Sequence, residues 1–235
     1  MSRHPFPPIH VAFIMDGNRR WASARNMPKM LGHRRGIDRL KEVINIAIEF
    51  GIRYVTFFVF STENWNRSRE EVSYLMGLFR DALRNTLQEQ HEKGVRVRTI
   101  GDMSGFPEDI QRLSVEAEEK TCRNTTLYAQ FALNYGGRGE IVRAMRSVVQ
   151  EVQNGKYRPE DITEETIATH LFTADVPDPD LLIRTSGELR LSNFLLWQLA
   201  YTEFVFIDKH WPDFSREEFQ HALDIYAKRQ RRHGL

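Results

Sequence analysis

The sequence contains a single cysteine, no long apolar run and almost no net charge. Cys122 alone excludes an internal disulfide framework and a cysteine-rich zinc site, and it fits a reducing compartment. No apolar run approaches the ~20 residues that a membrane-spanning helix needs, and the first ten residues, MSRHPFPPIH, lack the apolar segment of a signal peptide. A formal net charge of +1 gives no global basic field for nucleic acid. These absences predict a cytoplasmic protein that binds no nucleic acid and has at most peripheral membrane contact.

The size and composition of the chain suit one compact domain. Its 235 residues can bury a sizeable core, and 41% hydrophobic with 28% charged residues is an ordinary globular balance. We therefore treat residues 1–235 as a single domain and expect residues 1–8 to be flexible. Arginine outnumbers lysine, and several arginines stand at the ends of apolar runs. This placement favours local anion-binding sites over a solvated basic coat.

Apolar runs alternate with segments of helical spacing along most of the chain. This alternation predicts an α/β fold with a mostly parallel sheet and helices on its faces. The apolar spacing predicts helices within 37–48, 72–87 and 213–232. The predicted strands are Val11–Met15, Tyr54–Phe60, Val95–Ile100, Leu127–Leu133, Leu181–Ile183 and Phe204–Ile207.

The stretch HVAFIMDGNRRW, residues 10–21, carries the strongest local signal. Its apolar strand stops at Asp16, and Gly17 and Asn18 then favour a turn. In an open α/β sheet, ligands bind in the crevice beyond the carboxyl ends of the strands. A carboxylate can hold Mg²⁺, and the guanidinium groups of Arg19 and Arg20 can hold phosphate oxygens. The stretch therefore predicts a magnesium–diphosphate site.

Three further strands are followed by polar clusters that contain arginine. The clusters cover residues 61–67, 134–138 and 184–193. One such cluster is more often a solvated loop, but four of them at the same edge of a sheet favour a ligand site.

Several of these segments resemble the cis-prenyltransferase family, especially its bacterial undecaprenyl diphosphate synthases. The resemblance runs from about residue 9 to the end of the chain. It implies an enzyme that extends an allylic diphosphate, typically farnesyl diphosphate, with isopentenyl diphosphate units and forms Z double bonds. It also implies a six-stranded, mostly parallel sheet flanked by helices, a hydrophobic tunnel and a homodimer. The segments that carry it are HVAFIMDGNRRWA, GHRRG, FSTENWNR, NYGGR and DLLIRTSGELRLSNFLLWQLAYTEF.

The resemblance implies roles for individual residues. Asp16 matches the aspartate that works with Mg²⁺, and Glu203 matches a second acidic metal ligand. Asn64 matches the usual proton acceptor, although a neutral amide is a weak base and suits an orienting role better. The segment Arg232-His233-Gly234 resembles an element that reaches the partner subunit's active site. The remaining matches are, for the allylic diphosphate, Gly17, Asn18, Arg19, Arg20, Trp21, Lys29 and His33; for a mobile substrate loop, Ser61, Thr62, Glu63, Trp65 and Arg67; and for isopentenyl diphosphate, Arg184, Arg190, Leu191 and Ser192.

Some positions depart from the family pattern and leave the chain length of the product undetermined. Lys29 stands where arginine is frequent, Leu189 where some members carry histidine, and Val59 where a smaller alanine is common. The bulk of Val59 is expected to narrow the tunnel, for which Leu75, Phe79 and Leu83 are candidates that also read as ordinary core. A short-chain or irregular prenyl diphosphate synthase and a non-catalytic partner subunit therefore stay as alternatives. Peripheral membrane contact is a possible route for the release of a long product.

Overall fold

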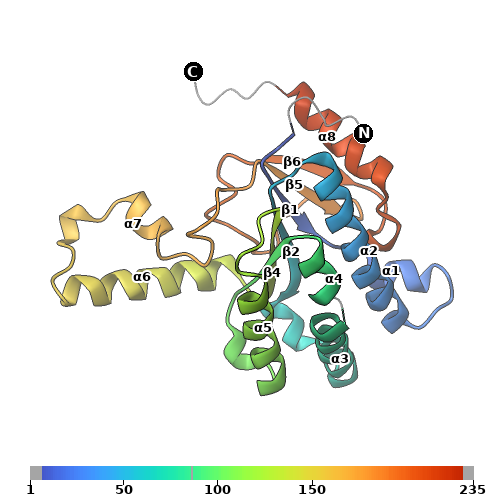
Figure 1. Ribbon diagram of the computed structural model, residues 1–235, viewed down its shortest axis with the longest axis horizontal. Helices are drawn as coiled ribbons and strands as arrows, with labels where there is room; N and C mark the ends of the chain where they lie inside the picture. The colour runs from blue at the N-terminus through green and yellow to red at the C-terminus, as the bar shows by residue number, and fades with distance from the viewer. Residues whose placement is uncertain (1–6, 86, 230–235) are drawn as a thin grey trace.

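The computed structural model describes residues 7–85 and 87–229, which form a six-stranded sheet with helices around it (Figure 1). The strand order is β3-β4-β2-β1-β5-β6, and every neighbouring pair is parallel. The strands are β1 (His10–Ile14), β2 (Tyr54–Ser61), β3 (Val95–Ile100), β4 (Leu127–Tyr135), β5 (Leu181–Thr185) and β6 (Glu203–Ile207).

All six predicted strands are present, and their bounds lie within two residues of the expected ones. Runs of β-branched and aromatic residues identify strands that are buried on both faces, as parallel strands are. The sheet is parallel throughout, where the sequence predicted a mostly parallel one, because every connection between consecutive strands is a crossover. Four of the five connections contain helices, and the one between β5 and β6, residues 186–202, is a long loop.

The helices occupy most of the segments between the strands. The stripe predicted over 72–87 is divided, since α3 ends at Asn85 and α4 begins at Leu87. The predicted closing helix over 213–232 begins later, at Arg216, because the side chain of Ser215 caps it; residues 230–232 lie outside the described part. The helices are α1 (Asn18–Ser23), α2 (Lys29–Phe50), α3 (Arg69–Asn85), α4 (Leu87–Glu92), α5 (Glu108–Thr121), α6 (Gly137–Gln153), α7 (Glu164–Ala168) and α8 (Arg216–Lys228), with short 3₁₀ turns η1 (Thr62–Asn66), η2 (Met103–Gly105), η3 (Pro159–Asp161) and η4 (Trp211–Asp213).

Alternate residues of each strand supply two separate cores. Phe13 and Phe57 stack on one face of the sheet at 5.1 Å, and α2, α5 and α8 cover this face. Ala12 and Ile14 point to the other face, where Phe194 and its neighbours in the segment after β5 cover them. The second face is thus closed by a loop rather than by a long helix, and that loop also carries the predicted isopentenyl diphosphate residues.

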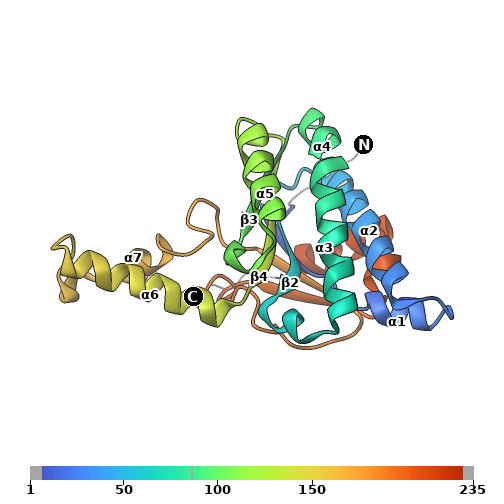
Figure 2. The same cartoon turned by 90° about the horizontal axis from the view of Figure 1, so that it is seen from below.

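Helices α6 and α7 extend away from the sheet as an arm, which both Figure 1 and Figure 2 show. A buried carboxylate anchors the base of the arm: Glu140 is 2% exposed and accepts hydrogen bonds from Tyr135, from Gln198 at 3.1 Å and from the Phe172 amide at 2.8 Å. These donors offset the cost of burying the charge. Burial, together with the charge of Glu140, raises the pKa of the Tyr135 hydroxyl above its usual range.

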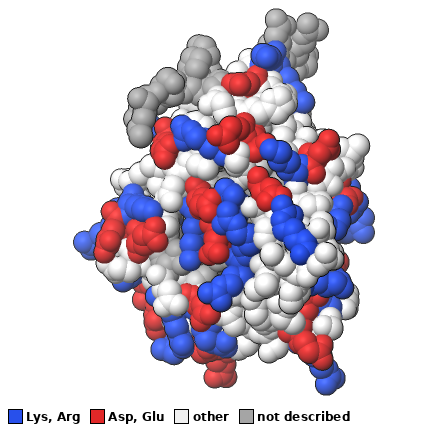
Figure 3. Space-filling model, turned by 90° about the vertical axis from the view of Figure 1, so that its right-hand side faces the viewer, with Lys and Arg blue, Asp and Glu red and all other residues white. Residues whose placement is uncertain are grey.

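Charged side chains of both signs are mixed on the face of the molecule that contains α1 and α2 (Figure 3). Arg35 and Arg39, for example, both pair with Glu42 on α2. Within the described residues, no helix has the length and apolarity required to cross a membrane.

A buried histidine in β1 predicts that the fold is sensitive to acid. His10 is 1% exposed, its Nδ1 lies 2.6 Å from the Pro177 carbonyl, and its Nε2 lies 2.8 Å from the Thr56 hydroxyl. Burial lowers the pKa of His10 from 6.5 to about 4. Between pH 6.5 and 4, His10 is protonated in the unfolded chain but neutral in the folded chain. We therefore expect the free energy of unfolding to fall by about 1.4 kcal/mol per pH unit over this range, roughly 3 kcal/mol in total.

Urea unfolding at successive pH values measures this effect, with His10→Asn as the test and the exposed His221→Gln as its control. The acid-dependent loss is expected to shrink in His10→Asn and to stay in His221→Gln. An identical pH dependence in all three proteins would contradict the assignment.

Candidate active site

The polar clusters that follow β1, β2, β4 and β5 meet at one edge of the sheet. Ile14 pairs with Arg184 in register, so Asp16 follows β1 at the level where β5 ends. Ser61 at the end of β2 pairs with Tyr135 at the end of β4. The expectation that these strand ends share one edge is therefore confirmed, because all the strands run in the same direction.

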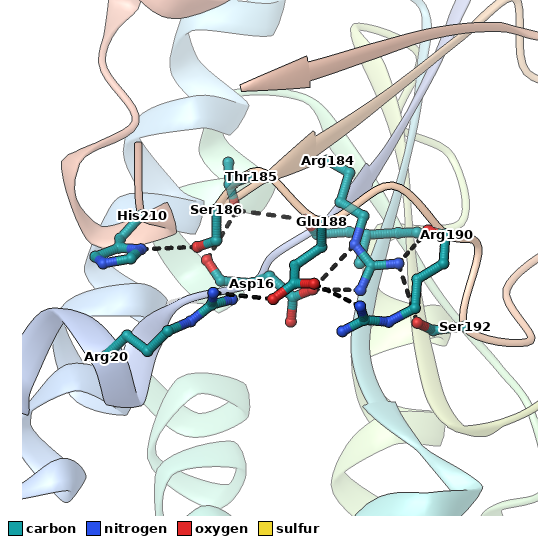
Figure 4. Close-up of polar contacts among 10 residues, drawn as sticks. Asp16, Arg20, Arg184, Thr185, Ser186, Glu188, Arg190, Ser192 and His210 are labelled. Atoms are coloured by element: carbon teal, nitrogen blue, oxygen red, sulfur yellow. Dashed lines mark hydrogen bonds and ion pairs between the residues drawn. The ribbon is translucent and has the colours of Figure 1, made fainter. Parts of the chain in front are cut away.

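Asp16 and Arg184 form the centre of the site (Figure 4). Arg184 donates to Asp16 Oδ2 from Nε at 3.0 Å and from Nη2 at 2.5 Å. Its Nη1 donates to the Arg190 carbonyl and, at 3.0 Å, to the Ser192 hydroxyl. The Arg184 side chain is 2% exposed, while that of Asp16 is 34% exposed. Arg184 thus orients the carboxylate and the loop after β5, and its donors are already engaged by protein atoms.

A polar pocket of about 500 Å³ lies beside Asp16. Its walls combine this one carboxylate with cationic side chains from different parts of the chain, so the pocket has a net positive lining that suits an anion. The pocket brings together most residues predicted for the allylic diphosphate, and it is lined by Met15, Asp16, Gly17, Asn18, Arg19, Arg20, Ser23, Lys29, His33 and Arg67.

The amino-terminal end of α2 opens onto this pocket through Lys29 and His33. The first turn of α2 contains no acidic residue, so the positive end of the helix dipole is free to favour an anion. Burial lowers the pKa of His33 below its ordinary value and outweighs the hydrogen bond to Glu71, which raises it. His33 therefore faces the pocket as a neutral ring near pH 7.

Glu71 from α3 organises one wall of the pocket. His33 Nε2 lies 2.9 Å from this carboxylate, Arg67 donates to it at 2.8 Å, and Arg19 lies 3.8 Å away. Burial alone would raise the pKa of Glu71, but the hydrogen bond from His33 and the charges of Arg67 and Arg19 lower it. The ionised carboxylate thus holds three predicted substrate-binding side chains together.

Glu188 connects the two predicted diphosphate sites. Its carboxylate lies 2.9 Å from Arg20 and also pairs with Arg190, whose side chain is 60% exposed (Figure 4). The hydrogen bond from Arg190 and the charges of Arg190 and Arg20 lower the pKa of Glu188. Of the predicted isopentenyl diphosphate residues, Arg190 presents the more accessible guanidinium, Ser192 binds Arg184, and Leu191 packs against the core of the second face.

The predicted substrate loop forms the 3₁₀ turn η1. The amide oxygen of Asn64 accepts the Ser61 backbone N–H at 3.1 Å, and Ser61 in return caps the turn. Trp65 donates to Asn134 at 2.8 Å and packs on Phe60. Glu63 at the start of the turn accepts a hydrogen bond from Asn193, and Thr62 lies beside Gly136. The turn is thus tied both to β4 and to the loop after β5.

Two predicted site residues lie away from this crevice. Trp21 points to the other side of α1, where its indole N–H donates to Asp213 at 2.7 Å, because it is rotated by one residue from Arg20 on the helix. Glu203 begins β6 and pairs in register with Leu181, and Leu181 pairs with Val11, so Glu203 lies at the opposite edge of the sheet from Asp16.

Glu203 forms an ion pair with Arg229 at 2.7 Å. Asp16 and Glu203 therefore do not come together within a single chain, and the role of Glu203 as a second acidic metal ligand stays a prediction. Within residues 7–85 and 87–229, no group of three or more histidine, cysteine or acidic side chains is placed to hold a metal ion. The segment Arg232-His233-Gly234 lies outside the described residues.

Sequence reasoning missed Glu71, Glu188 and Asn193 as members of the site. Asn193 donates to Glu63 at 3.2 Å and accepts the Arg138 N–H at 2.9 Å, which joins η1 to the start of α6. The spacing from Ser68 to Glu71 is a capping signal that marks the start of α3, but it does not show that the carboxylate turns toward His33. Glu188 and Asn193 belong to the polar cluster of residues 184–193, but no local sequence pattern distinguishes them from the other members of that cluster as site residues.

Gly17 predicts a strong local effect of a single methyl group. Its φ is +100°, and a Cβ atom there would lie 2.0 Å from Ser186 Oγ and 2.7 Å from His210 Nδ1. We expect Gly17→Ala to reduce the free energy of unfolding by about 1–3 kcal/mol and to disturb Asp16. Chemical denaturation measures the loss, with Gly77→Ala in α3 as the control, since nothing lies within 4 Å of a Cβ there. Equal stability of the two variants would contradict this view of the turn.

Comparisons with known proteins agree with the fold. Residues 14–234 match a protein family described as putative undecaprenyl diphosphate synthase. An isoprenyl transferase of Rhizobium meliloti is 54% identical, with 97% of this chain and 92% of the relative covered. A ditrans,polycis-undecaprenyl-diphosphate synthase of Micrococcus luteus, described as (2E,6E)-farnesyl-diphosphate specific, is 48% identical, with 97% and 91% covered.

A solved structure is similar over the same extent. A crystal structure of lavandulyl diphosphate synthase from Lavandula x intermedia in complex with dimethylallyl diphosphate superposes with a TM-score of 0.95 at 40% identity. The match covers 97% of this chain and 99% of that one. Together with the crevice built around Asp16 and Arg184, these matches show that the chain belongs to the prenyltransferase family of undecaprenyl diphosphate synthases.

Proposed function

We propose that this chain condenses isopentenyl diphosphate with an allylic diphosphate, farnesyl diphosphate in the first instance, and builds a Z-polyprenyl diphosphate, with undecaprenyl diphosphate as the product. The observation that carries the proposal is the pairing of a cationic pocket around Asp16 with the exposed Arg190 at the same sheet edge. One diphosphate leaves in this reaction and the other stays. Two anion-binding groups on either side of one carboxylate match that requirement.

The allylic diphosphate is assigned to the pocket lined by Arg19, Arg20 and Lys29. When the allylic C–O bond breaks, negative charge grows on the departing diphosphate, and fixed cationic donors stabilise it. The isopentenyl double bond then attacks the allylic carbon, and one proton leaves. Holding the two substrates side by side removes much of the entropic barrier. Asn64 already accepts a hydrogen bond from Ser61, which fits an orienting role, and a diphosphate oxygen is the better base.

Magnesium is proposed as the cofactor, with Asp16 as its protein ligand. Mg²⁺ is usually held by one or two carboxylates together with substrate phosphates. Asp16 fits this mode of binding, because both hydrogen bonds from Arg184 go to Oδ2 and leave Oδ1 for a metal ion. A bound Mg²⁺ would neutralise charge on the diphosphate. Arg184 meanwhile keeps the carboxylate oriented through these two hydrogen bonds.

The hydrocarbon tail is assigned to an apolar cavity between the sheet and the helices α2, α3 and α4. Val59, Phe79 and Leu83, which are among the candidate tunnel residues, line this cavity. Leu75 instead belongs to the core around Phe60. In this conformation the cavity measures about 110 Å³. A cavity of about 150 Å³ holds one benzene molecule, so a long product requires these walls to move apart.

The small cavity is also the observation that favours a second candidate, a short-chain or irregular prenyl diphosphate synthase on the same fold. The similar lavandulyl diphosphate synthase, whose structure contains dimethylallyl diphosphate, is in keeping with this candidate. The two candidates share the site chemistry and differ in the length of the product.

Incubation with labelled isopentenyl diphosphate and Mg²⁺, with either dimethylallyl or farnesyl diphosphate as the primer, tests the proposal. Product sizing is expected to show a ladder that ends at undecaprenyl diphosphate with farnesyl diphosphate. Chelation of the metal is expected to stop the incorporation. A single short product would select the second candidate, and no product with either primer would point to a non-catalytic partner subunit.

A second copy of this chain is the proposed protein partner. The arm exposes an apolar stripe on α6, in which Val142 is 50%, Met145 39% and Val149 49% exposed. Their spacing places them along one side of the helix, and a self-complementary face of this kind suits a homodimer. Sedimentation is expected to show a dimer that Val149→Asp weakens, while Val115→Asp on α5, also exposed, does not. Monomeric wild-type protein would contradict the proposal. Peripheral membrane contact and a cytoplasmic location stay predictions.

A further inference from the structure

A buried amide without a partner lies in the wall of the apolar cavity. Gln90, on α4, is 4% exposed and lines the cavity together with hydrocarbon side chains such as Leu83 and Leu87. Among the residues that the structure describes, neither Oε1 nor Nε2 of Gln90 has a hydrogen-bond partner. Buried polar groups are nearly always paired, so this exception calls for an explanation.

The cavity runs from the site edge of the sheet toward the opposite edge. Val59 lies near the end of β2, next to the crevice. Val97 lies deeper, because it pairs with Ala129 in β4, which pairs in turn with Val55 in β2. Val55 precedes Ser61 by six residues, which is roughly 20 Å of strand.

Gln90 belongs to the deep end of this cavity. Helix α4 ends at Glu92 and leads directly to Val95, where β3 begins at the edge opposite the site. A hydrocarbon tail whose diphosphate is held at Asp16 and that grows along the cavity passes Val59 first and reaches Gln90 last. The amide thus stands where added isoprenoid units would arrive.

We infer that Gln90 is a specificity-determining residue that limits the length of the product. The inference rests on the proposed function and adds to it the group that ends elongation. An apolar tail cannot hydrogen-bond to the amide, and it would displace any water that does. Each unit that reaches Gln90 therefore binds less well than the preceding unit, and release is favoured over a further condensation.

Lys41 also lines the cavity but does not impose the same limit. Its long stem can lie along apolar surface while the ammonium group extends toward water. The side chain of Gln90 is shorter and almost completely buried. Its polar atoms therefore stay in the wall of the cavity.

The test compares product ladders from farnesyl diphosphate and labelled isopentenyl diphosphate for three variants. Gln90→Met keeps the length of the side chain and removes its polarity. It is expected to lengthen the longest product by at least one C5 unit. The ratio of elongated to released product at the wild-type length is expected to rise by about fivefold or more. Gln90→Glu, with a charge at the same place, is expected to shorten the ladder. Leu87→Met is the matched control on the same helix, and its ladder is expected to equal that of the wild type.

The KM values for both substrates and the rate of the first condensation are expected to be unchanged in Gln90→Met, since the tail is then far from Gln90. A Gln90→Met ladder that equals or is shorter than the wild-type ladder would overturn the inference. Gln90→Leu gives a second reading if the Met variant is unstable. A wild-type protein that forms no prenyl product contradicts the proposed function itself, which separates the two failures.

Discussion

Asp16→Asn is expected to reduce prenyl transfer on the order of 10³-fold while the fold stays intact. Asparagine has the same shape and still accepts the hydrogen bonds from Arg184, but it lacks the charge that a metal-bound diphosphate requires. Steady-state turnover with both substrates measures the loss. Turnover within about tenfold of the wild type would contradict the role of Asp16.

The alanine variant carries a second effect that the structure reveals. The sequence alone predicts that Asp16→Ala leaves the fold intact. Arg184, however, is 2% exposed, and Asp16 is its carboxylate partner. An unpaired buried charge costs about 3–5 kcal/mol, so Asp16→Ala is expected to unfold more readily than Asp16→Asn.

A nearby carboxylate serves as the control for these variants. Asp213 pairs with Arg25 and Trp21 on the far side of α1 and is 41% exposed. Asp213→Asn removes the same charge at a short distance from the pocket and is expected to keep turnover near that of the wild type. A comparable loss in Asp213→Asn would mean that general electrostatics, and not the position of Asp16, controls the reaction.

Arg190→Ala is expected to raise the KM for isopentenyl diphosphate by about 10- to 100-fold with a smaller change in kcat. Arg190 is exposed and contacts Glu188, so a diphosphate can replace that carboxylate without breaking a buried pair. The KM of each substrate, measured separately with the other substrate saturating, distinguishes the two sites. An unchanged KM for isopentenyl diphosphate would contradict the assignment.

Glu188 adds a secondary consequence to that prediction. Without Arg190, the carboxylate pairs with Arg20 alone and competes there with the allylic diphosphate. The KM for the allylic substrate is therefore expected to rise slightly in Arg190→Ala. The double variant Arg190→Ala with Glu188→Gln is expected to restore it while the defect toward isopentenyl diphosphate stays. A further rise in the allylic KM would show that Glu188 does not compete.

The strands could be predicted because each is a compact apolar run that ends in polar residues. In a parallel sheet this also fixes which residues share an edge, and Asp16 and Arg184 do. The same reasoning places Glu203, the first residue of its strand, at the opposite edge, while its role as a metal ligand stays a prediction of the family resemblance. Ion pairs such as those of Glu71 depend on how helices pack on the sheet, which local spacing does not specify.

The cavity could be predicted from the sequence only in part. Phe79 and Leu83 have the spacing of ordinary core residues, and only the packing of α3 and α4 against the sheet turns them into the wall of a cavity. Gln90 has no apolar periodicity and carries no signal in the sequence. Its burial depends on the short helix α4, whose separation from α3 the apolar spacing did not reveal.

The central claim is that one crevice holds two diphosphates at once. The most direct measurement is calorimetric titration of isopentenyl diphosphate into wild-type protein that is saturated with Mg²⁺ and an unreactive farnesyl diphosphate analogue, in which sulfur replaces the bridging oxygen. We expect that one isopentenyl diphosphate binds per chain without displacing the analogue, and that Arg190→Ala weakens only this binding. Displacement of the analogue, or no binding of isopentenyl diphosphate, would contradict this claim.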